Sequence, residues 1–519
     1  MREHAGKADT TSVERRPRST VAWLFIMLFG VLAAVETARI LPRLDDMLVN
    51  EDGAFYMLLA QSLASGSGYR HLSSPGEPAH VLFPPAFPVV LAGLRLVGFE
   101  SVTAAKVLVL IFAVAAVPVA FFVLKPRAGT AISALIAVWM MLHPDYLRSA
   151  TKVSSDVPYL FWSLVALVTI RASARQPGWR DGAGVMAWLA TVAAALTRAV
   201  GLPLAVAAPV YLAWSKAAPR WRPRLVAALL LAVCYGAPLV AWECWKAASS
   251  SDELGGYTML LQQRDAYDWD EGTISGIDDI TERLLDNARR CVRGLGGLMI
   301  GTGTDRQRSL IGLAALGLIA AGMVAAVRRG EWFVEAYLFL AAAATVTHPM
   351  PQLPRYLVPM LPFLLFYPAM LLTLAGRTGH STAVVALALL VAIGVGTHDI
   401  EGREGKLRPA YGEYRATARW LGVNTPPDAV VLCRKPALMY LWSDRKSIAF
   451  PFSRDPALTD DRVERNGITH VVEDSFSPYT ALFLEPWLRG LANDRALAHQ
   501  NGNTRVWQLA VEARGQRGT

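Results

Sequence analysis

Carboxylate and guanidinium side chains stand at the ends of several apolar runs in this chain. Glu51 and Asp52 follow the first run, and Asp156 begins a later one. Arg198 and Arg355 lie beside two others. A carboxylate near a hydroxyl can act as a general base, and arginine presents a planar fork of donors that matches a phosphate. If these groups gather at one membrane face, they would suit transfer between a lipid phosphate and a hydroxyl acceptor.

The elements that must position these groups are mostly apolar. The chain has 519 residues, of which 53% are hydrophobic and only 18% are charged, and its mean hydropathy is +0.32. This composition is typical of a polytopic α-helical membrane protein and excludes an ordinary soluble globule. The net charge is +9, but the basic residues form short clusters between apolar runs. That pattern is typical of cytoplasmic loops, so nucleic acid is not an expected partner.

Twelve apolar runs could cross a membrane. They cover 21–40, 83–98, 102–124, 130–150, 156–170, 184–197, 199–214, 225–245, 309–327, 332–347, 356–375 and 381–397. If all twelve crossed, strict alternation would place most basic clusters outside, against the positive-inside bias. The run 83–98 is short, begins with Phe83-Pro84-Pro85 and carries Arg95. Placing it on the outer surface moves every basic cluster to the cytoplasm, which predicts about eleven spans.

This topology divides the chain into three parts. We expect a basic cytoplasmic tail at 1–20, followed by an uncleaved first helix because no small-residue cleavage site follows it. A membrane domain at 21–398 would carry two long outer loops, 41–101 and 246–308. The last part, 399–519, alternates helical patterns with strand-like runs at 429–432, 446–450, 468–473 and 504–511. It is predicted to form a small α/β domain on the outer face.

The loop 246–308 also contains one amphipathic stretch. Ile280, Leu284, Leu285, Ala288 and Val292 recur at helical spacing on one face, which predicts an amphipathic helix.

Four stretches, all on the predicted outer side, carry a resemblance to a known family. They are EDGAFYMLLA at 51–60 with SGSGY at 65–69 and FPPAFP at 83–88, KVSSDVP at 152–158, LTRAVG at 196–201, and PRYLVPMLP at 354–362. In this order the chain resembles the GT-C superfamily of polyprenyl-phosphate-dependent membrane glycosyltransferases over residues 20–400. The pattern is similar to the lipid A aminoarabinose transferases and to the protein O-mannosyltransferases of the dolichyl-phosphate-mannose type.

The resemblance implies a role for each charged residue. Asp52 would be the general base that takes the proton of the acceptor hydroxyl while that oxygen attacks the anomeric carbon, with inversion. Glu51 would orient Asp52 or the acceptor, and Asp156 would position the acceptor or help to hold a metal. Arg198 and Arg355 would bind the donor phosphate, where positive charge favours the leaving group. The expected walls of the sugar or lipid pocket are Tyr56, Tyr69 and His348.

The resemblance also implies partners and a location. A polyprenyl-phosphate-linked sugar would be the donor, and a surface lipid or glycan the acceptor, at the outer face of the plasma (inner) membrane. No cofactor is certain and a divalent metal ion is compatible with the family, although the nine histidines show no paired spacing that favours zinc. The outer domain resembles the small α/β domains appended to some of these transferases, without a catalytic constellation of its own.

Structural alternatives apply to each site residue. Asp52 could only solvate a loop, and Asp156 could be a helix N-cap. Arg198 and Arg355 could extend to the membrane interface without binding a ligand, and His348 could make a local hydrogen bond. Two other function classes also remain: a transporter or flippase of lipid-linked substrates, which would favour ionisable residues near the bilayer midplane, and a non-catalytic assembly protein that binds through its outer domain.

Overall fold

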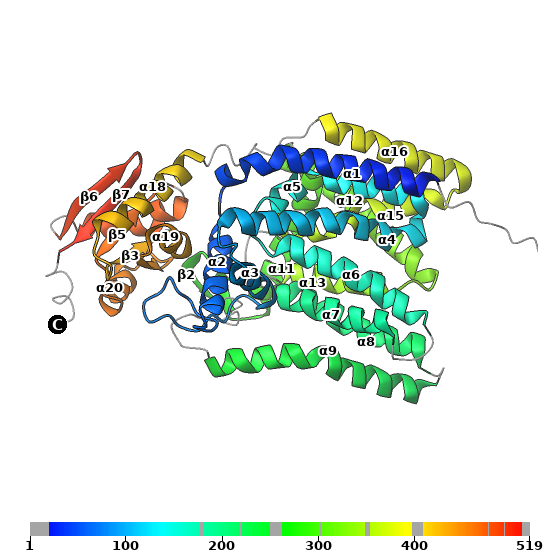
Figure 1. Ribbon diagram of the computed structural model, residues 1–519, viewed down its shortest axis with the longest axis horizontal. Coiled ribbons are helices and arrows are strands. Elements are labelled where there is room, and N and C mark those ends of the chain that lie inside the picture. Colours follow the sequence, from blue (N-terminus) through cyan, green and yellow to red (C-terminus); the bar gives the residue numbers. More distant parts are fainter. Residues whose placement is uncertain are drawn as a thin grey trace, which may run out of the picture.

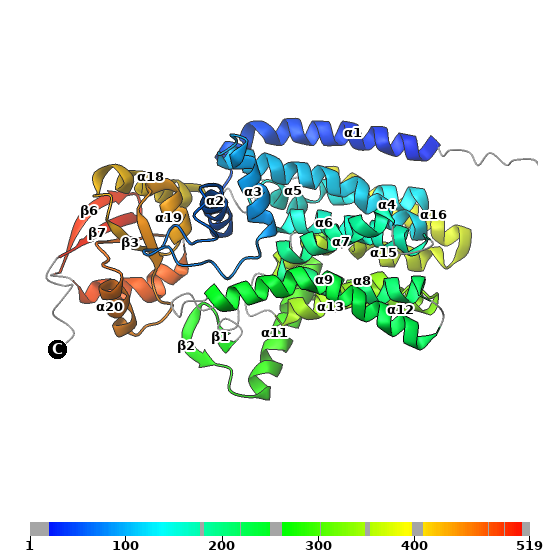
Figure 2. The same cartoon turned by 60° about the horizontal axis from the view of Figure 1, so that its bottom comes forward.

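A bundle of long apolar helices fills one end of the molecule and a small sheet fills the other (Figure 1). The computed structural model describes residues 20–176, 181–217, 220–249, 262–301, 303–347, 353–396, 408–475, 477–491 and 494–510. Helices α2 (Glu51–Ala64) and α3 (Ala86–Leu96) run across the direction of the bundle and lie between the two ends. Figure 2 shows the same order from a second direction. The expected boundary at residue 399 falls outside the described residues and stays a prediction.

The bundle is built from the predicted apolar runs. Its helices are α1 (Thr20–Ile40), α4 (Val102–Leu142), α6 (Asp156–Ala174), α7 (Gly182–Thr197), α8 (Leu202–Lys216), α9 (Trp221–Ser249), α12 (Asp305–Arg328), α13 (Phe333–Val346), α15 (Leu361–Thr373) and α16 (Gly376–Gly396). Among the described residues, five helical segments are both long and apolar enough to cross a membrane. The count of about eleven spans therefore stays a prediction.

A glycine joins two of the predicted runs inside α4. Gly129 has φ 75° and ψ 175°, so the helix is interrupted between the runs 102–124 and 130–150. The second run ends α4 at Leu142 and continues as α5 (Pro144–Ala150). A positive φ is strained for residues with a Cβ, whereas glycine adopts it readily.

Short elements lie at the end of the bundle nearer the sheet. They are η1 (Leu41–Asp46), α2 (Glu51–Ala64), α3 (Ala86–Leu96), α5 (Pro144–Ala150), η2 (Ala199–Gly201), α14 (Leu353–Tyr356) and η4 (Val358–Met360). Helix α3 corresponds to the run 83–98 and has only 11 residues. At about 1.5 Å per residue it is roughly 16 Å long, far less than the roughly 30 Å of a hydrocarbon core. This length agrees with the prediction that the run does not cross the membrane.

The loop 246–308 contains a hairpin and a helix. Strands β1 (Gln263–Asp265) and β2 (Asp268–Thr273) pair antiparallel, and α11 (Ile277–Ile300) follows them. The predicted amphipathic helix is present, and its apolar face is only partly buried. Ile280 and Leu285 are exposed, and the buried positions, such as Leu295 and Leu298, lie nearer the end where α11 packs on α12.

The sheet has five strands in the order β4-β3-β5-β7-β6. They are β3 (Val430–Cys433), β4 (Lys446–Ala449), β5 (His470–Glu473), β6 (Arg495–Asn501) and β7 (Thr504–Leu509), with helices α18 (Arg408–Asn424), α19 (Pro436–Ser443), α20 (Pro456–Arg465), the π-helix η5 (Thr480–Leu484) and α21 (Glu485–Gly490). Strands β3, β4 and β5 are parallel, while β6 and β7 form an antiparallel hairpin. The four predicted strand-like runs correspond to β3, β4, β5 and β7, and the sequence prediction missed β6.

Helix α2 connects the bundle with the sheet because it is apolar on two sides. Tyr56, Met57 and Ala60 belong to the core of the bundle. Ala54 and Leu58 pack instead into a cluster with residues of α18, α19, β3 and β5. A helix that is buried on both sides cannot shift towards one unit without leaving the other.

A glycine sets how closely α2 approaches the turn before α6. Gly53 donates its main-chain N–H to Oδ1 of Asn50, the N-cap of α2, at 3.1 Å. A Cβ at this position would lie 2.8 Å from the carbonyl oxygen of Val153 and 2.8 Å from that Asn50 oxygen. The first turn of α2, with Asp52, is thereby packed directly against the start of α6.

We predict that Gly53→Ala destabilises the protein by about 1–3 kcal/mol, because the added methyl group forces backbone to move. The measurement is thermal unfolding of the detergent-purified chain. Gly236→Ala in α9 is the matched control, since a Cβ there has no neighbour within 4 Å, and it should unfold no earlier than the wild type. Equal melting of the Gly53 variant and the wild type would contradict the close approach.

Candidate active site

Two carboxylates and two guanidinium groups form one connected chain of ion pairs. Nη1 of Arg355 lies 2.6 Å from Oδ2 of Asp52, and its Nε lies 2.6 Å from Oδ2 of Asp156. Nη1 of Arg198 lies 2.5 Å from Oδ1 of Asp156. The order is Asp52–Arg355–Asp156–Arg198. The structure therefore brings together four of the residues that the sequence singled out, from four separate segments of the chain.

Each of these residues lies at the end of a helical element. Asp52 is in the first turn of α2, and Asp156 is the first residue of α6. Arg198 is the extended residue between α7 and η2, and Arg355 lies in α14. The α7–η2 junction is tight, because a Cβ on Gly201 would lie 2.7 Å from a main-chain oxygen of α7. Helix ends place all four side chains at the same end of the bundle.

The two carboxylates differ in their access to solvent. The side chain of Asp156 is 1% exposed, and both of its oxygens accept from guanidinium groups. Asp52 is 33% exposed, and within the described part of the chain Arg355 is its one bonded partner. A buried carboxylate must be paired to be tolerated. Both oxygens of Asp156 are thus occupied by the two arginines, while Asp52 keeps an accessible oxygen.

These contacts decide between the structural alternatives for two residues. Ser155, not Asp156, is the N-cap of α6, so the expectation of an aspartate N-cap is wrong. Arg198 does not extend towards the interface alone, because it donates to Asp156 and to Oγ of Ser155 at 3.1 Å and its guanidinium lies 5.1 Å from the Tyr356 ring centre.

Tyr56 is connected to the ion-pair chain through a serine. Its hydroxyl lies 2.8 Å from Oγ of Ser155, which also accepts from Arg198. Its ring packs at 5.0 Å from the rings of Phe83 and Phe87, and burial raises the pKa of its hydroxyl. Ser155 was not among the predicted site residues, although it lies in the family-like stretch 152–158. Its position directly before the acid was the available signal.

Tyr69, another of the expected pocket residues, has its hydrogen bonds away from this cluster among the described residues. The Tyr69 hydroxyl donates to the carbonyl oxygen of Phe83 at 2.9 Å, and its ring meets Trp242 and Trp245 of α9. Tyr69 therefore holds the proline-rich turn instead of lining the ion-pair chain. His348 lies outside the described residues, so its expected role stays a prediction.

Glu51 points away from its neighbour Asp52. Its Oε1 accepts the main-chain N–H of Ala437 in α19 at 3.0 Å. Its Oε2 is buried and has no hydrogen-bond partner among the described residues. Burial raises the pKa of Glu51 to about 7, although Lys435 and Arg434 oppose the shift. Glu51 therefore bonds to the sheet region, and its expected role of orienting Asp52 or the acceptor stays a prediction.

The described residues contain no group of three or more His, Cys, Asp or Glu side chains that could hold a metal ion. A role for a divalent metal stays a prediction of the resemblance.

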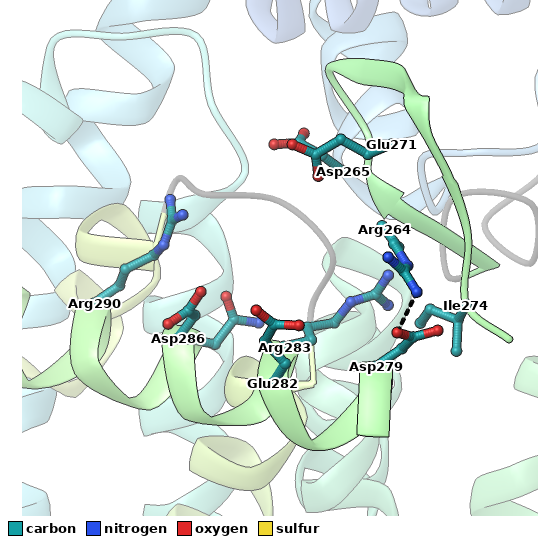
Figure 3. A pocket seen from close by; sticks show the side chains of 10 residues that line it. Arg264, Asp265, Glu271, Ile274, Asp279, Glu282, Arg283, Asp286 and Arg290 are labelled. Carbon is teal, nitrogen blue, oxygen red and sulfur yellow. Dashed lines mark hydrogen bonds and ion pairs between the residues drawn. The ribbon is translucent and has the colours of Figure 1, made fainter. Parts of the chain in front are cut away.

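A polar cavity of about 370 Å³ lies between the β1–β2 hairpin and α11 (Figure 3). It is lined by Arg264, Asp265, Glu271, Ile274, Asp279, Glu282, Arg283, Asp286, Asn287 and Arg290. The pair Arg264–Asp279, at 2.5 Å, connects the hairpin with the start of α11. Helix α11 also packs against α14, the element that carries Arg355. The cavity therefore adjoins the framework of the ion-pair chain without including its residues.

We predict that Glu51→Gln removes a pH dependence of stability. Because the pKa is raised from 4.5 to about 7 in the folded protein, the folded state binds the proton more tightly than the unfolded state does. This stabilisation is complete below pH 4.5 and is lost as the pH rises to about 7. The melting temperature of the wild type should fall across this range by more than that of Glu51→Gln. Glu77→Gln replaces a carboxylate that is exposed and serves as the control, which should keep the wild-type dependence of melting temperature on pH. The same pH dependence in the wild type and in both variants would contradict the burial of the Glu51 carboxylate.

Solved structures are similar to this chain in fold, over both the helix bundle and the sheet region. ArnT from Cupriavidus metallidurans bound to undecaprenyl phosphate matches with a TM-score of 0.55 at 14% identity, covering 96% of this chain and 100% of that one. The apo state of the same protein matches with a TM-score of 0.57 at 16% identity and with the same coverage. The Archaeoglobus fulgidus oligosaccharyltransferase AglB, in complex with an inhibitory peptide and a dolichol-phosphate, gives 0.52 at 12% identity, covering 87% of this chain and 69% of that one. No family model and no curated protein matches the chain. At such low identity the likeness concerns the fold, and the chain has the fold of the GT-C membrane glycosyltransferases.

Proposed function

We propose that this chain is a membrane glycosyltransferase that moves a sugar from a polyprenyl-phosphate donor to a hydroxyl acceptor on a surface lipid or glycan. The observation that carries the proposal is the ion-pair chain Asp52–Arg355–Asp156–Arg198, at 2.5 to 2.6 Å spacings. It supports the proposal because an accessible carboxylate lies beside guanidinium groups, which can bind a phosphate. The fold is shared with ArnT bound to undecaprenyl phosphate and with AglB in complex with a dolichol-phosphate, which supports a lipid-phosphate donor.

Asp52 is the general base in this proposal. It accepts the proton of the acceptor hydroxyl as that oxygen forms a bond to the anomeric carbon of the sugar. The bond from the anomeric carbon to the phosphate oxygen breaks, and its electron pair leaves with the polyprenyl phosphate. Direct displacement inverts the anomeric configuration. The partial exposure of Asp52 supports this role, because an acceptor can reach it.

Arg355 and Arg198 stabilise the phosphate that leaves. Guanidinium groups form strong, directional hydrogen bonds with phosphate oxygens, and positive charge where negative charge develops lowers the barrier. Asp156 bonds to both guanidinium groups and holds them in place, so it is a positioning residue. In the structure Arg355 also pairs with Asp52, and a donor phosphate would compete for that guanidinium and release the carboxylate for its role as base.

The proposed location is the plasma membrane, with the N-terminal tail in the cytoplasm and the sheet region outside. The basic clusters between the apolar runs support this orientation. Helix α2, whose first turn carries Asp52, lies where the bundle meets the sheet region, at one end of the bundle (Figure 1). A site at this end suits chemistry at a membrane surface better than transport through the bilayer midplane.

We predict that Asp52→Asn lowers product at least about 100-fold, the range expected for loss of a general base. The product is defined as the surface lipid or glycan mass that disappears when the gene is deleted, measured by mass spectrometry and normalised to protein in the membrane. Asp145→Asn is the matched control, since Asp145 is exposed and pairs with Arg148 instead, and it should retain product. Full product in the Asp52 variant, or no mass lost on deletion, would overturn the proposal.

A further inference from the structure

The two neighbouring acids at the start of α2 contact different parts of the molecule. Asp52 pairs with Arg355 of the bundle at 2.6 Å. Glu51 instead reaches the sheet region, where the N–H of Ala437 donates to it at 3.0 Å across 386 positions of sequence. Residues one apart on a helix point about 100° from each other. A contact that fixes Glu51 therefore also fixes the direction in which Asp52 points.

The partner of Glu51 is the start of an eight-residue helix. Ala437 is the second residue of α19, which begins at Pro436. The first turn of a helix carries main-chain N–H groups without internal partners and a partial positive charge, which favours a carboxyl group there. Arg434 and Lys435 directly before α19 add positive charge close to Glu51. The site is thus built to receive the oxygen of this side chain.

Apolar contacts surround the same point. Ala54 and Leu58 of α2 share a cluster with Tyr414 and Leu438 of the sheet region. Immediately before α2, the main-chain N–H of Val49 donates to the Tyr411 hydroxyl at 3.2 Å. The first turn of α2 is held from the side opposite the ion-pair chain.

We infer that the C-terminal sheet region is a positioning element of the transfer reaction, and that Glu51, seated at the start of α19, fixes the first turn of α2 and holds Asp52 in place. This inference rests on the proposed function, since it concerns the base assigned there. It differs from a region that only binds the acceptor, because loosening the contact disturbs Asp52 itself. It also makes Glu51 a positioning residue and not a second acid or base.

The test compares Glu51→Gln with Glu51→Asp. The glutamine keeps the length and an oxygen that accepts from Ala437, and it removes the charge. The aspartate keeps the charge, but its shorter side chain withdraws the carboxylate from Ala437. If Glu51 positions α2, the glutamine variant retains most of the product and the aspartate variant loses at least about tenfold, because misplacement by about 1 Å can cost up to about 100-fold.

Product is measured as before, as the surface mass that depends on the gene. Hydrogen exchange of the full-length purified protein adds a readout that does not depend on substrate. Amides at 50–58 should exchange faster in Glu51→Asp than in Glu51→Gln. Lys446→Ala is the matched control, because it breaks another contact between the same two units, to Glu77 and the carbonyl oxygen of Leu72 after α2. It should leave exchange at 50–58 and product unchanged.

The outcomes separate this inference from the proposed function. An active aspartate variant with an inactive glutamine variant would show that Glu51 acts through its charge and would overturn the inference. Equal exchange at 50–58 in both variants would do the same. Product that persists in Asp52→Asn would instead remove the proposed function, whatever the Glu51 variants do. Loss of product in Lys446→Ala to the same degree as in Glu51→Asp would show a general loosening of the two units, which also contradicts the inference.

Discussion

A buried carboxylate organises the end of the helix bundle that lies nearer the sheet. Asp156 is 1% exposed, and each of its oxygens bonds a different guanidinium group. Removing one partner would leave a buried charge without compensation, which is strongly unfavourable. The segments that carry Arg198 and Arg355 therefore cannot leave α6 independently. Through Arg355 the constraint extends to Asp52, so that four elements distant in sequence are held at one point.

Helix α2 is the element through which the bundle and the sheet region influence each other. Gly53 lets its first turn approach the carbonyl oxygen of Val153, and no residue with a Cβ could do so without displacement. Tyr56 extends the contact to the serine that Arg198 also binds. On the other side Glu51 reaches α19. The chemistry that we propose for Asp52 thus depends on packing against two units at once.

The elements that local patterns describe well are the ones that the sequence predicts. Apolar runs became helices, and the strand-like runs became β3, β4, β5 and β7, because burial with a regular period is visible in the residues themselves. Strand β6 was missed because its alanine, glutamine and asparagine residues have low strand propensity, although Asn501-Gly502 before β7 is a hairpin signal and Gly502 has φ 59°. The spacing of Ile280 and Leu285 predicted the helix α11 but not which neighbours cover its apolar face, because those neighbours come from tertiary contacts.

The sequence by itself determined which residue types stand at the helix ends, because the order of apolar runs and charges is a local property. The charge map and the family resemblance predicted that Asp52, Asp156, Arg198 and Arg355 gather at one face. Only the tertiary structure decided which of them touch. Asp156 meets Arg198 across 42 positions and Arg355 across 199, and no periodicity encodes such distances. The packing also turned Glu51 towards α19 and Tyr69 towards the proline-rich turn. The direction of a side chain depends on the neighbours that surround its helix, and those neighbours come from the whole chain.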